Sequence, residues 1–227
     1  MELDIKICGL KTEEAVAAAL DGGASHLGFI FFEKSPRNVA VETAARLRQA
    51  ARDRAKAVAV SVDADDRTLA RIVEGMEPDM LQLHGKESPE RVAALKARYG
   101  LPIMKAVSVR EASDLEGLGA YRGIADRFLL DSKPPPGAEL PGGNGMPFDW
   151  RLLTFLDGDV DYMLSGGLNA ANIGAALGLC RPRGIDISSG VERAPGEKDP
   201  DLIRAFFHAV QAAGEARDQR RRHEQAG

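Results

Sequence analysis

Residues 162–192 read YMLSGGLNAANIGAALGLCRPRGIDISSGVE and contain one complete structural unit. A short apolar run at 162–165 leads into a glycine-containing turn, and an Ala-rich helical pattern follows over 170–179. A second apolar run at 184–188 then leads into another glycine-containing turn. A strand, a helix and a strand in this order predict a parallel βαβ unit.

The same alternation extends over most of the chain. Strand-like runs occupy residues 3–8, 26–32, 57–62, 80–84, 103–107, 127–131, 162–165 and 184–188. Helical patterns follow them at 12–20, 41–55, 67–73, 89–98, 112–118, 150–156, 170–179 and 200–213. Eight such units favour a closed barrel over an open doubly wound sheet, and no strand leads into a GxGxxG helix start. We therefore predict an α/β protein with a single (β/α)₈ TIM barrel at residues 1–213.

Composition narrows the class of protein. The chain has 227 residues, a formal charge of -4 and no clustered basic face, so no nucleic-acid partner is expected. Cys8 and Cys180 are too few for a disulfide framework, which favours a reducing compartment. No leader-like or membrane-spanning run is visible, so we expect a cytoplasmic protein without a membrane partner, monomeric rather than dimeric. Residues 214–227 are polar and are predicted to form a frayed or disordered tail.

Polar side chains gather near the carboxyl ends of the predicted strands. Because side chains alternate along a strand, Lys6 shares a face with Cys8, and Gln82 shares one with His84. The remaining polar members of these strands are Lys105, Asp131, Asp186 and Ser188. Each alone has an ordinary structural explanation, since a buried cysteine, for example, is usually an inert small hydrophobe. Active sites of barrels lie at this end, so we expect their joint position to form one pocket.

Two loops are suited to bind a phosphate. Gly166 and Gly167 follow the seventh strand, and Ser188, Ser189 and Gly190 follow the eighth. Glycines let backbone N–H groups approach an anion closely, and barrels often hold phosphate after these two strands. No Walker motif is present, so nucleotide hydrolysis is not expected. The Pro- and Gly-rich segment 132–148 is long enough for an active-site loop.

Several short motifs follow one another along the chain. In order, they are KICGL (6–10), FF (31–32) with SPR (35–37), LQLHG (81–85), LLDS (129–132), GGNG (142–145) with FDW (148–150), SGGLN (165–169), and DISSGVE (186–192) with PGEKD (195–199). Together these motifs resemble the phosphoribosylanthranilate isomerase family of tryptophan biosynthesis. Asn144, Ala171 and the VSV at 60–62 depart from the family's usual residues, but none of these changes removes an ionisable group.

The resemblance implies a reaction and a role for each residue. The family converts N-(5'-phosphoribosyl)anthranilate to 1-(2-carboxyphenylamino)-1-deoxyribulose 5-phosphate by an Amadori rearrangement. This rearrangement needs one proton donor and one proton acceptor, and the resemblance implies no cofactor and no metal. Asp131 would be the general acid and Cys8 the general base, whose thiolate Lys6 or the substrate iminium could favour. Arg37 would pair with the anthranilate carboxylate.

The remaining assignments concern the substrate pocket. Asp186 is expected to contact the substrate amine or a sugar hydroxyl, with Gln82 and His84 in support. One rival is the histidine-pathway isomerase family, which is expected to have a site with two aspartates, one of them on the first strand. This chain has Cys8 at that position, which argues against the rival. A second rival is a barrel that only binds a phosphorylated ligand. The presence of both Cys8 and Asp131 argues against it.

Overall fold

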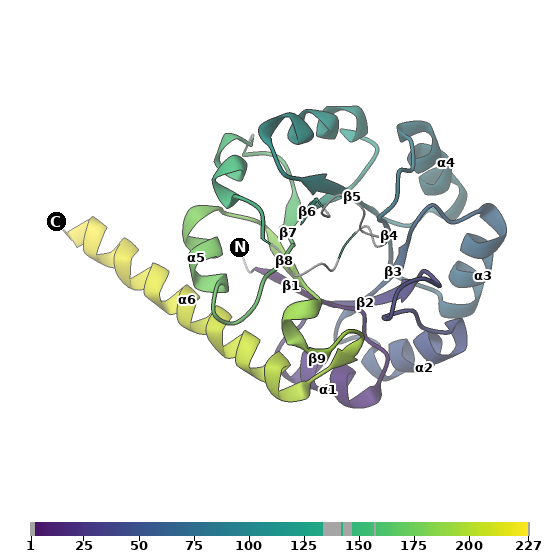
Figure 1. The fold of residues 1–227 in the computed structure, drawn as a ribbon, viewed down its shortest axis with the longest axis horizontal. Coiled ribbons are helices and arrows are strands. Elements are labelled where there is room, and N and C mark those ends of the chain that lie inside the picture. The colour runs from purple at the N-terminus through teal and green to yellow at the C-terminus, as the bar shows by residue number, and fades with distance from the viewer. Residues whose placement is uncertain (1–2, 134–141, 143–146, 157, 227) are drawn as a thin grey trace.

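The chain forms a closed eight-stranded barrel. The computed structural model describes residues 3–133, 142, 147–156 and 158–226, so most of the predicted 132–148 loop, Asn144 included, lies outside the described residues. The strands are β1 (Asp4–Cys8), β2 (His26–Phe31), β3 (Lys56–Ser61), β4 (Met80–Leu83), β5 (Ile103–Val109), β6 (Arg127–Ser132), β7 (Tyr162–Leu164) and β8 (Gly184–Ile187). All pair in parallel in chain order, and β8 closes on β1. The predicted TIM barrel is confirmed (Figure 1).

Helices surround the barrel, as Figure 1 shows. They are α1 (Glu13–Asp21), α2 (Val41–Ala51), α3 (Asp66–Met76), α4 (Pro89–Tyr99), α5 (Ile173–Leu179) and α6 (Pro200–Ala226), with 3₁₀ segments η1 (Ala112–Tyr121), η2 (Trp150–Phe155) and η3 (Ser189–Val191). Side-chain oxygens of Thr12, Asp65 and Ser88 accept from the first turns of α1, α3 and α4, which fixes where these helices begin.

The interior of the barrel is packed with side chains. One cluster comprises Cys8, Val58, Val60, Met80, Met104, Ala106, Leu129 and Met163. Because Met104 and Ala106 belong to this cluster, Lys105 points to the other side of β5. Its ammonium bonds Glu87 at 3.0 Å and lies 5.8 Å from the centre of the Tyr121 ring. The expectation that Lys105 joins the inner polar face is therefore wrong, since it ties β5 to the loop after β4.

Two features follow the last strand of the barrel. A short antiparallel hairpin, β9 (Glu192–Ala194) and β10 (Glu197–Lys198), stands between β8 and α6 and was not predicted. Helix α6 runs past residue 213, and Figure 1 shows its C-terminal part extending away from the barrel. Whether residues 214–227 fray in solution stays a prediction. Among the described residues, no helix has the length and apolarity needed to cross a membrane.

Candidate active site

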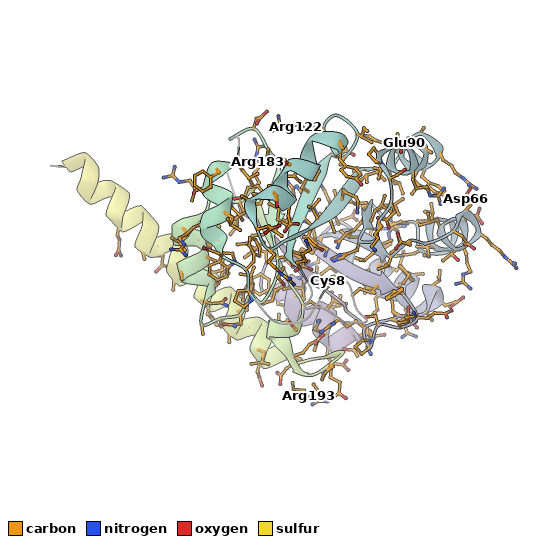
Figure 2. All side chains as sticks on the ribbon, turned by 45° about the horizontal axis from the view of Figure 1, so that its top comes forward. Cys8, Asp66, Glu90, Arg122, Arg183 and Arg193 are labelled. Carbon is orange, nitrogen blue, oxygen red and sulfur yellow. The ribbon has the colours of Figure 1, made fainter. Side chains whose placement is uncertain are left out.

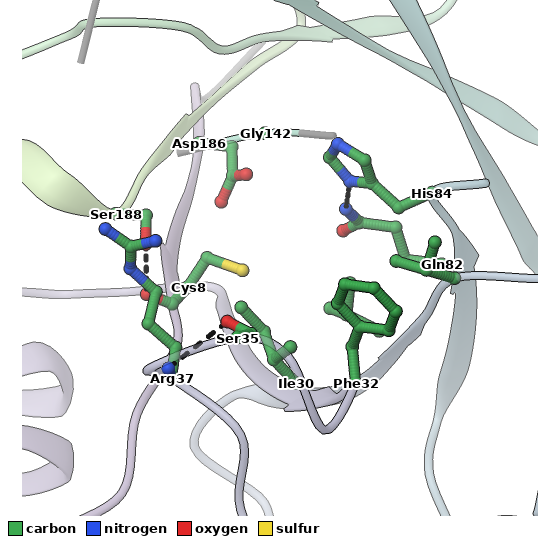
Figure 3. A pocket seen from close by; sticks show the side chains of 12 residues that line it. Cys8, Ile30, Phe32, Ser35, Arg37, Gln82, His84, Gly142, Asp186 and Ser188 are labelled. Atoms are coloured by element: carbon green, nitrogen blue, oxygen red, sulfur yellow. Dashed lines mark hydrogen bonds between the residues drawn. The ribbon is translucent and has the colours of Figure 1, made fainter. Parts of the chain in front are cut away.

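The carboxyl ends of the strands enclose a cavity of about 60 Å³. Its lining comes from several strands and the loops that follow them: Cys8, Ile30, Phe32, Ser35, Arg37, Val60, Val62, Gln82, His84, Gly142, Asp186 and Ser188. Figure 2 places Cys8 near the middle of the molecule, within the ring of strands. In Figure 3 the Cys8 thiol and the Asp186 carboxylate point into the same space, opposite Gln82 and His84. The pocket expected from the strand ends is thus present.

Cys8 ends β1 and is almost fully buried beside a charged pair. Lys6, two residues earlier and fully buried, donates from Nζ to Oδ1 of Asp186 at 2.9 Å. Burial raises the pKa of Cys8 above its ordinary value, and the Asp186 carboxylate acts in the same direction. The Lys6 ammonium lowers this pKa, as expected from the sequence, but it does not outweigh burial. Burial therefore favours the thiol over the thiolate.

Asp131 lies on β6 with His84 beside it. Oδ2 of Asp131 is 3.3 Å from Nε2 of His84, while its Oδ1 accepts from the backbone N–H of Ser132 at 2.9 Å. On the other side of the ring, Nε2 of Gln82 lies 2.9 Å from Nδ1 of His84. With the amide in this orientation Gln82 donates to Nδ1, while Nε2 lies near Asp131 without a recorded hydrogen bond among the described residues. Gln82 thus orients the His84 ring, and the ring lies beside the Asp131 carboxyl group.

The two predicted phosphate loops meet in a smaller cavity of about 20 Å³. It is lined by Asp131, Ser165, Gly166, Gly167, Leu168, Asp186, Ile187, Ser188 and Ser189. Gly166 and Gly167 have φ of 88° and 64°, a conformation that glycine adopts without strain. Gly190 is not in the lining, and a side chain there would collide with the Leu168 carbonyl. Its role in the structure is to let the two loops pack together.

Arg37 is held from one side by the β9–β10 hairpin. Its Nε and Nη2 donate to the two carboxylate oxygens of Glu192, both at 2.8 Å. Lys198 bonds Glu192 at 2.5 Å, and burial lowers the pKa of Lys198 to about 8. Burial opposes the charged form of Glu192, but the bond from Arg37 and the charge of Lys198 lower its pKa. Sequence reasoning assigned Arg37 but gave no role to Glu192 or Lys198, although both lie in the quoted motifs.

The structure therefore brings the predicted residues together in two adjoining cavities. Cys8, Arg37, Gln82 and His84 line the larger one. Asp131 and the glycine and serine loops line the smaller one, while Asp186 and Ser188 line both. Ser165 and Gly142 also contribute lining but were not assigned from the sequence. Gly142 stands against the acid, since a Cβ there would lie 2.7 Å from Oδ2 of Asp131.

Comparison with known proteins points to one family. The family model described as N-(5'-phosphoribosyl)anthranilate (PRA) isomerase matches residues 5–209. A protein of that name from Chelativorans sp. (strain BNC1) is 80% identical over 213 residues, which is 94% of this chain and 98% of the relative. One from Mesorhizobium japonicum is 69% identical over 217 residues, covering 96% and 99% of the two chains.

Solved structures agree with the sequence relatives. The phosphoribosyl anthranilate isomerase of Thermotoga maritima superimposes with a TM-score of 0.83 at 33% identity, covering 93% of this chain and 100% of that one. A second structure, at TM-score 0.80 and 31% identity over 93% and 100%, is a complex with reduced 1-(o-carboxyphenylamino)-1-deoxyribulose 5-phosphate. The family-model match over residues 5–209, the high identity to curated relatives and the shared fold assign this protein to the N-(5'-phosphoribosyl)anthranilate isomerase family of tryptophan biosynthesis.

Proposed function

We propose that the protein isomerises N-(5'-phosphoribosyl)anthranilate with Asp131 as the general acid and Cys8 as the general base. The observation that carries this assignment is the position of the two groups. Cys8 is the last residue of β1 and Asp131 the last but one of β6, and the two line adjoining cavities that share Asp186 and Ser188. A substrate that bridges the two cavities would place its ribose between a proton donor and a proton acceptor, which the rearrangement requires.

The first step opens the ribose ring. Asp131 protonates the ring oxygen, and the anthranilate nitrogen supplies the electron pair that breaks the C1–O bond and becomes an iminium. Nε2 of His84 lies 3.3 Å from Oδ2, so a small turn of the ring lets it donate to the carboxylate that this transfer leaves behind. Gln82 keeps His84 in the tautomer that makes this contact.

The second step removes the C2 proton. The Cys8 thiol must first release its proton to water, and burial disfavours the thiolate that forms. A cationic iminium beside the sulfur opposes that effect, so thiolate formation is coupled to ring opening. The thiolate takes the C2 proton and the electrons flow to the nitrogen, giving an enamine that tautomerises to the ketose. The substrate nitrogen is the electron sink throughout.

Three further contacts position the substrate. Backbone N–H groups around Gly166, Gly167 and Ser189 bind the phosphate in the smaller cavity. Arg37 binds the anthranilate carboxylate at the opposite end. Asp186, whose carboxylate lines both cavities, accepts from the substrate amine or a sugar hydroxyl. We also propose that the protein acts in the cytoplasm and that it is a monomer. Analytical ultracentrifugation tests the oligomeric state. One Thermotoga maritima relative is described as dimeric.

The decisive experiment follows the fluorescence of phosphoribosylanthranilate as purified protein converts it. We expect turnover by the wild type, and a loss of about 10²–10⁴-fold in kcat for Cys8→Ser and for Asp131→Asn. Cys180→Ala is the matched control. Cys180 is also buried, but its sulfur bonds the Ala176 carbonyl and the Tyr162 side chain, and it lines neither cavity. Near-normal kcat in either site variant would refute the acid–base assignment. Binding without turnover by the wild type would indicate a binding protein.

A further inference from the structure

The β9–β10 hairpin holds the loop that carries Arg37 at several points. Glu192 pairs with the guanidinium through both carboxylate oxygens. The turn glycine, Gly196, packs so closely on Pro36 that an added Cβ would collide with the Pro36 carbonyl. Arg37 also packs its stem against Gly9, where a Cβ would lie 2.9 Å from Cδ. The position of the guanidinium is therefore fixed by the hairpin on one side and by the end of β1 on the other.

The pairing with Glu192 uses only one edge of the guanidinium. An arginine has five N–H donors, and a carboxylate can bind either the Nε/Nη2 edge or the Nη1/Nη2 edge. Glu192 occupies the first edge. Within the described part of the chain, Nη1 has no recorded hydrogen bond, and Arg37 lines the larger cavity. The second edge thus remains for a second carboxylate.

The charges around Arg37 do not balance without a ligand. Arg37 and Glu192 neutralise one another at 2.8 Å, with both side chains buried. Lys198 is equally buried, and its Nζ lies 2.5 Å from Glu192. Two cations and one carboxylate leave one positive charge out of bulk water, a state that favours the arrival of one further anion.

We infer that Glu192 and Lys198 are positioning residues for recognition of an aromatic carboxylate: Glu192 fixes the guanidinium of Arg37, and Lys198 offsets Glu192 so that Arg37 keeps a net attraction for the ligand. This inference rests on the proposed function, in which the anthranilate carboxylate is that ligand. Without Lys198, the substrate carboxylate meets an Arg37 whose charge Glu192 already satisfies, and the preference for a carboxylate on the ring is lost.

Lys198 also touches the other end of the site. Its Nζ donates to the carbonyl of Ser188 at 3.0 Å and to the Oγ of Ser188 at 3.2 Å. Ser188 Oγ in turn donates to the Cys8 carbonyl at 3.0 Å. A test must therefore separate carboxylate recognition from effects on the sugar and phosphate. A ratio of two affinities does so when both ligands carry the same sugar phosphate.

The experiment measures calorimetric Kd values for two ligands. One is reduced 1-(o-carboxyphenylamino)-1-deoxyribulose 5-phosphate, and the other is the same molecule without the carboxylate. Their Kd ratio is the carboxylate preference. We expect Lys198→Met to lower this preference about tenfold or more. Glu192→Gln added to Lys198→Met should restore most of it, because Gln still accepts from Arg37 while the missing negative charge leaves Arg37 uncompensated.

The controls separate this inference from folding and from the proposed function. Arg193→Met removes an exposed cation from the same hairpin and should leave the preference unchanged. If Lys198→Met does not fold, Lys198→Gln keeps a hydrogen-bond donor without the charge and carries the same expectation. An unchanged preference in the Lys198 variant, or a double variant no better than the single one, overturns the inference. A wild type that neither binds the reduced product nor turns over substrate overturns the proposed function instead.

Discussion

Replacing Lys6 with Met should raise the pKa of the Cys8 thiol still further above its ordinary value, because it removes the ammonium that lowers that pKa. A Cβ at Gly28 would lie 2.9 Å from Cys8 Sγ and 3.1 Å from Lys6 Cε, so these two atoms are at most about 6 Å apart. The charge lies on Nζ, one bond beyond Cε, so at an effective dielectric constant of about 20 it contributes roughly 2–3 kcal/mol to the ionisation. The sign follows because, of the two forms of Cys8, the ammonium stabilises the thiolate and not the neutral thiol.

Asp186→Asn should move the same pKa in the opposite direction. The Asp186 carboxylate raises the pKa of Cys8, and it also holds the Lys6 ammonium at 2.9 Å. Removing its charge leaves Lys6 with the sulfur as its anionic partner. We therefore expect the pKa of the thiol to fall. Opposite shifts from two neighbouring substitutions are a signature that general loosening of the barrel would not produce.

The assay reads the thiolate directly. Only the thiolate reacts with iodoacetamide, so the rate of carboxamidomethylation against pH gives the pKa, and peptide mass spectrometry separates Cys8 from Cys180. The midpoint should lie above that of an ordinary thiol in the wild type, higher in Lys6→Met and lower in Asp186→Asn. Equal midpoints in all three proteins, or shifts of the same sign in both variants, would refute the electrostatic argument.

Four further predictions follow from the geometry. Arg37→Met should raise KM far more than it lowers kcat, because the carboxylate it binds persists through the reaction; steady-state kinetics checks this. Gly166→Ala should weaken competition by inorganic phosphate, because φ is 88° and the new Cβ would lie 2.6 Å from the Ser132 nitrogen. The carboxylate preference should decline from pH 7 to 9, because Lys198 has a pKa of about 8 and loses its charge over this range. Glu192, Cys8 and Arg37 are the titratable groups that face Lys198, and Lys198→Met should abolish the decline. Burial lowers the pKa of His26 to about 4, below its unfolded value of about 6.5. The unfolded state therefore binds more protons between these values, so the free energy of unfolding should decrease as pH falls from 6.5 to 4, and urea titrations of His26→Gln should show a weaker decrease.

The strands were predictable because their signal is local. Each apolar run is short and is followed by a helical pattern, so all eight strands fall within two residues of the predicted bounds at each end. The helix after β5 was less well defined: a helical pattern over 112–118 proves to be the 3₁₀ segment Ala112–Tyr121. Gly117 and Gly119 lie inside it, and glycine weakens an α-helix. Alternation identified which residues share a face, but it could not tell which face points inward at Lys105.

The charged contacts around the site could not be predicted from the sequence. Glu192 and Lys198 begin and end a seven-residue hairpin with no apolar periodicity, so no strand pattern marks them. Arg37, the partner of Glu192, is 155 residues away along the chain. Only the closure of β8 on β1 brings the two segments together, and closure is a property of the whole barrel. The residues that bear the chemistry could be assigned one at a time, whereas the pairs that position them required the fold.

The long separation between Arg37 and Glu192 has a consequence for synthesis of the chain. Arg37 leaves the ribosome among the first residues, but its carboxylate partner follows 155 residues later, after the last barrel strand. A nascent or truncated chain that ends before Glu192 lacks the carboxylate that binds the Arg37 guanidinium. Native contacts of such high sequence separation form late in folding. Recovery of carboxylate recognition during refolding should therefore mark the completion of the barrel, and fragments produced by proteolysis or early termination would lack it.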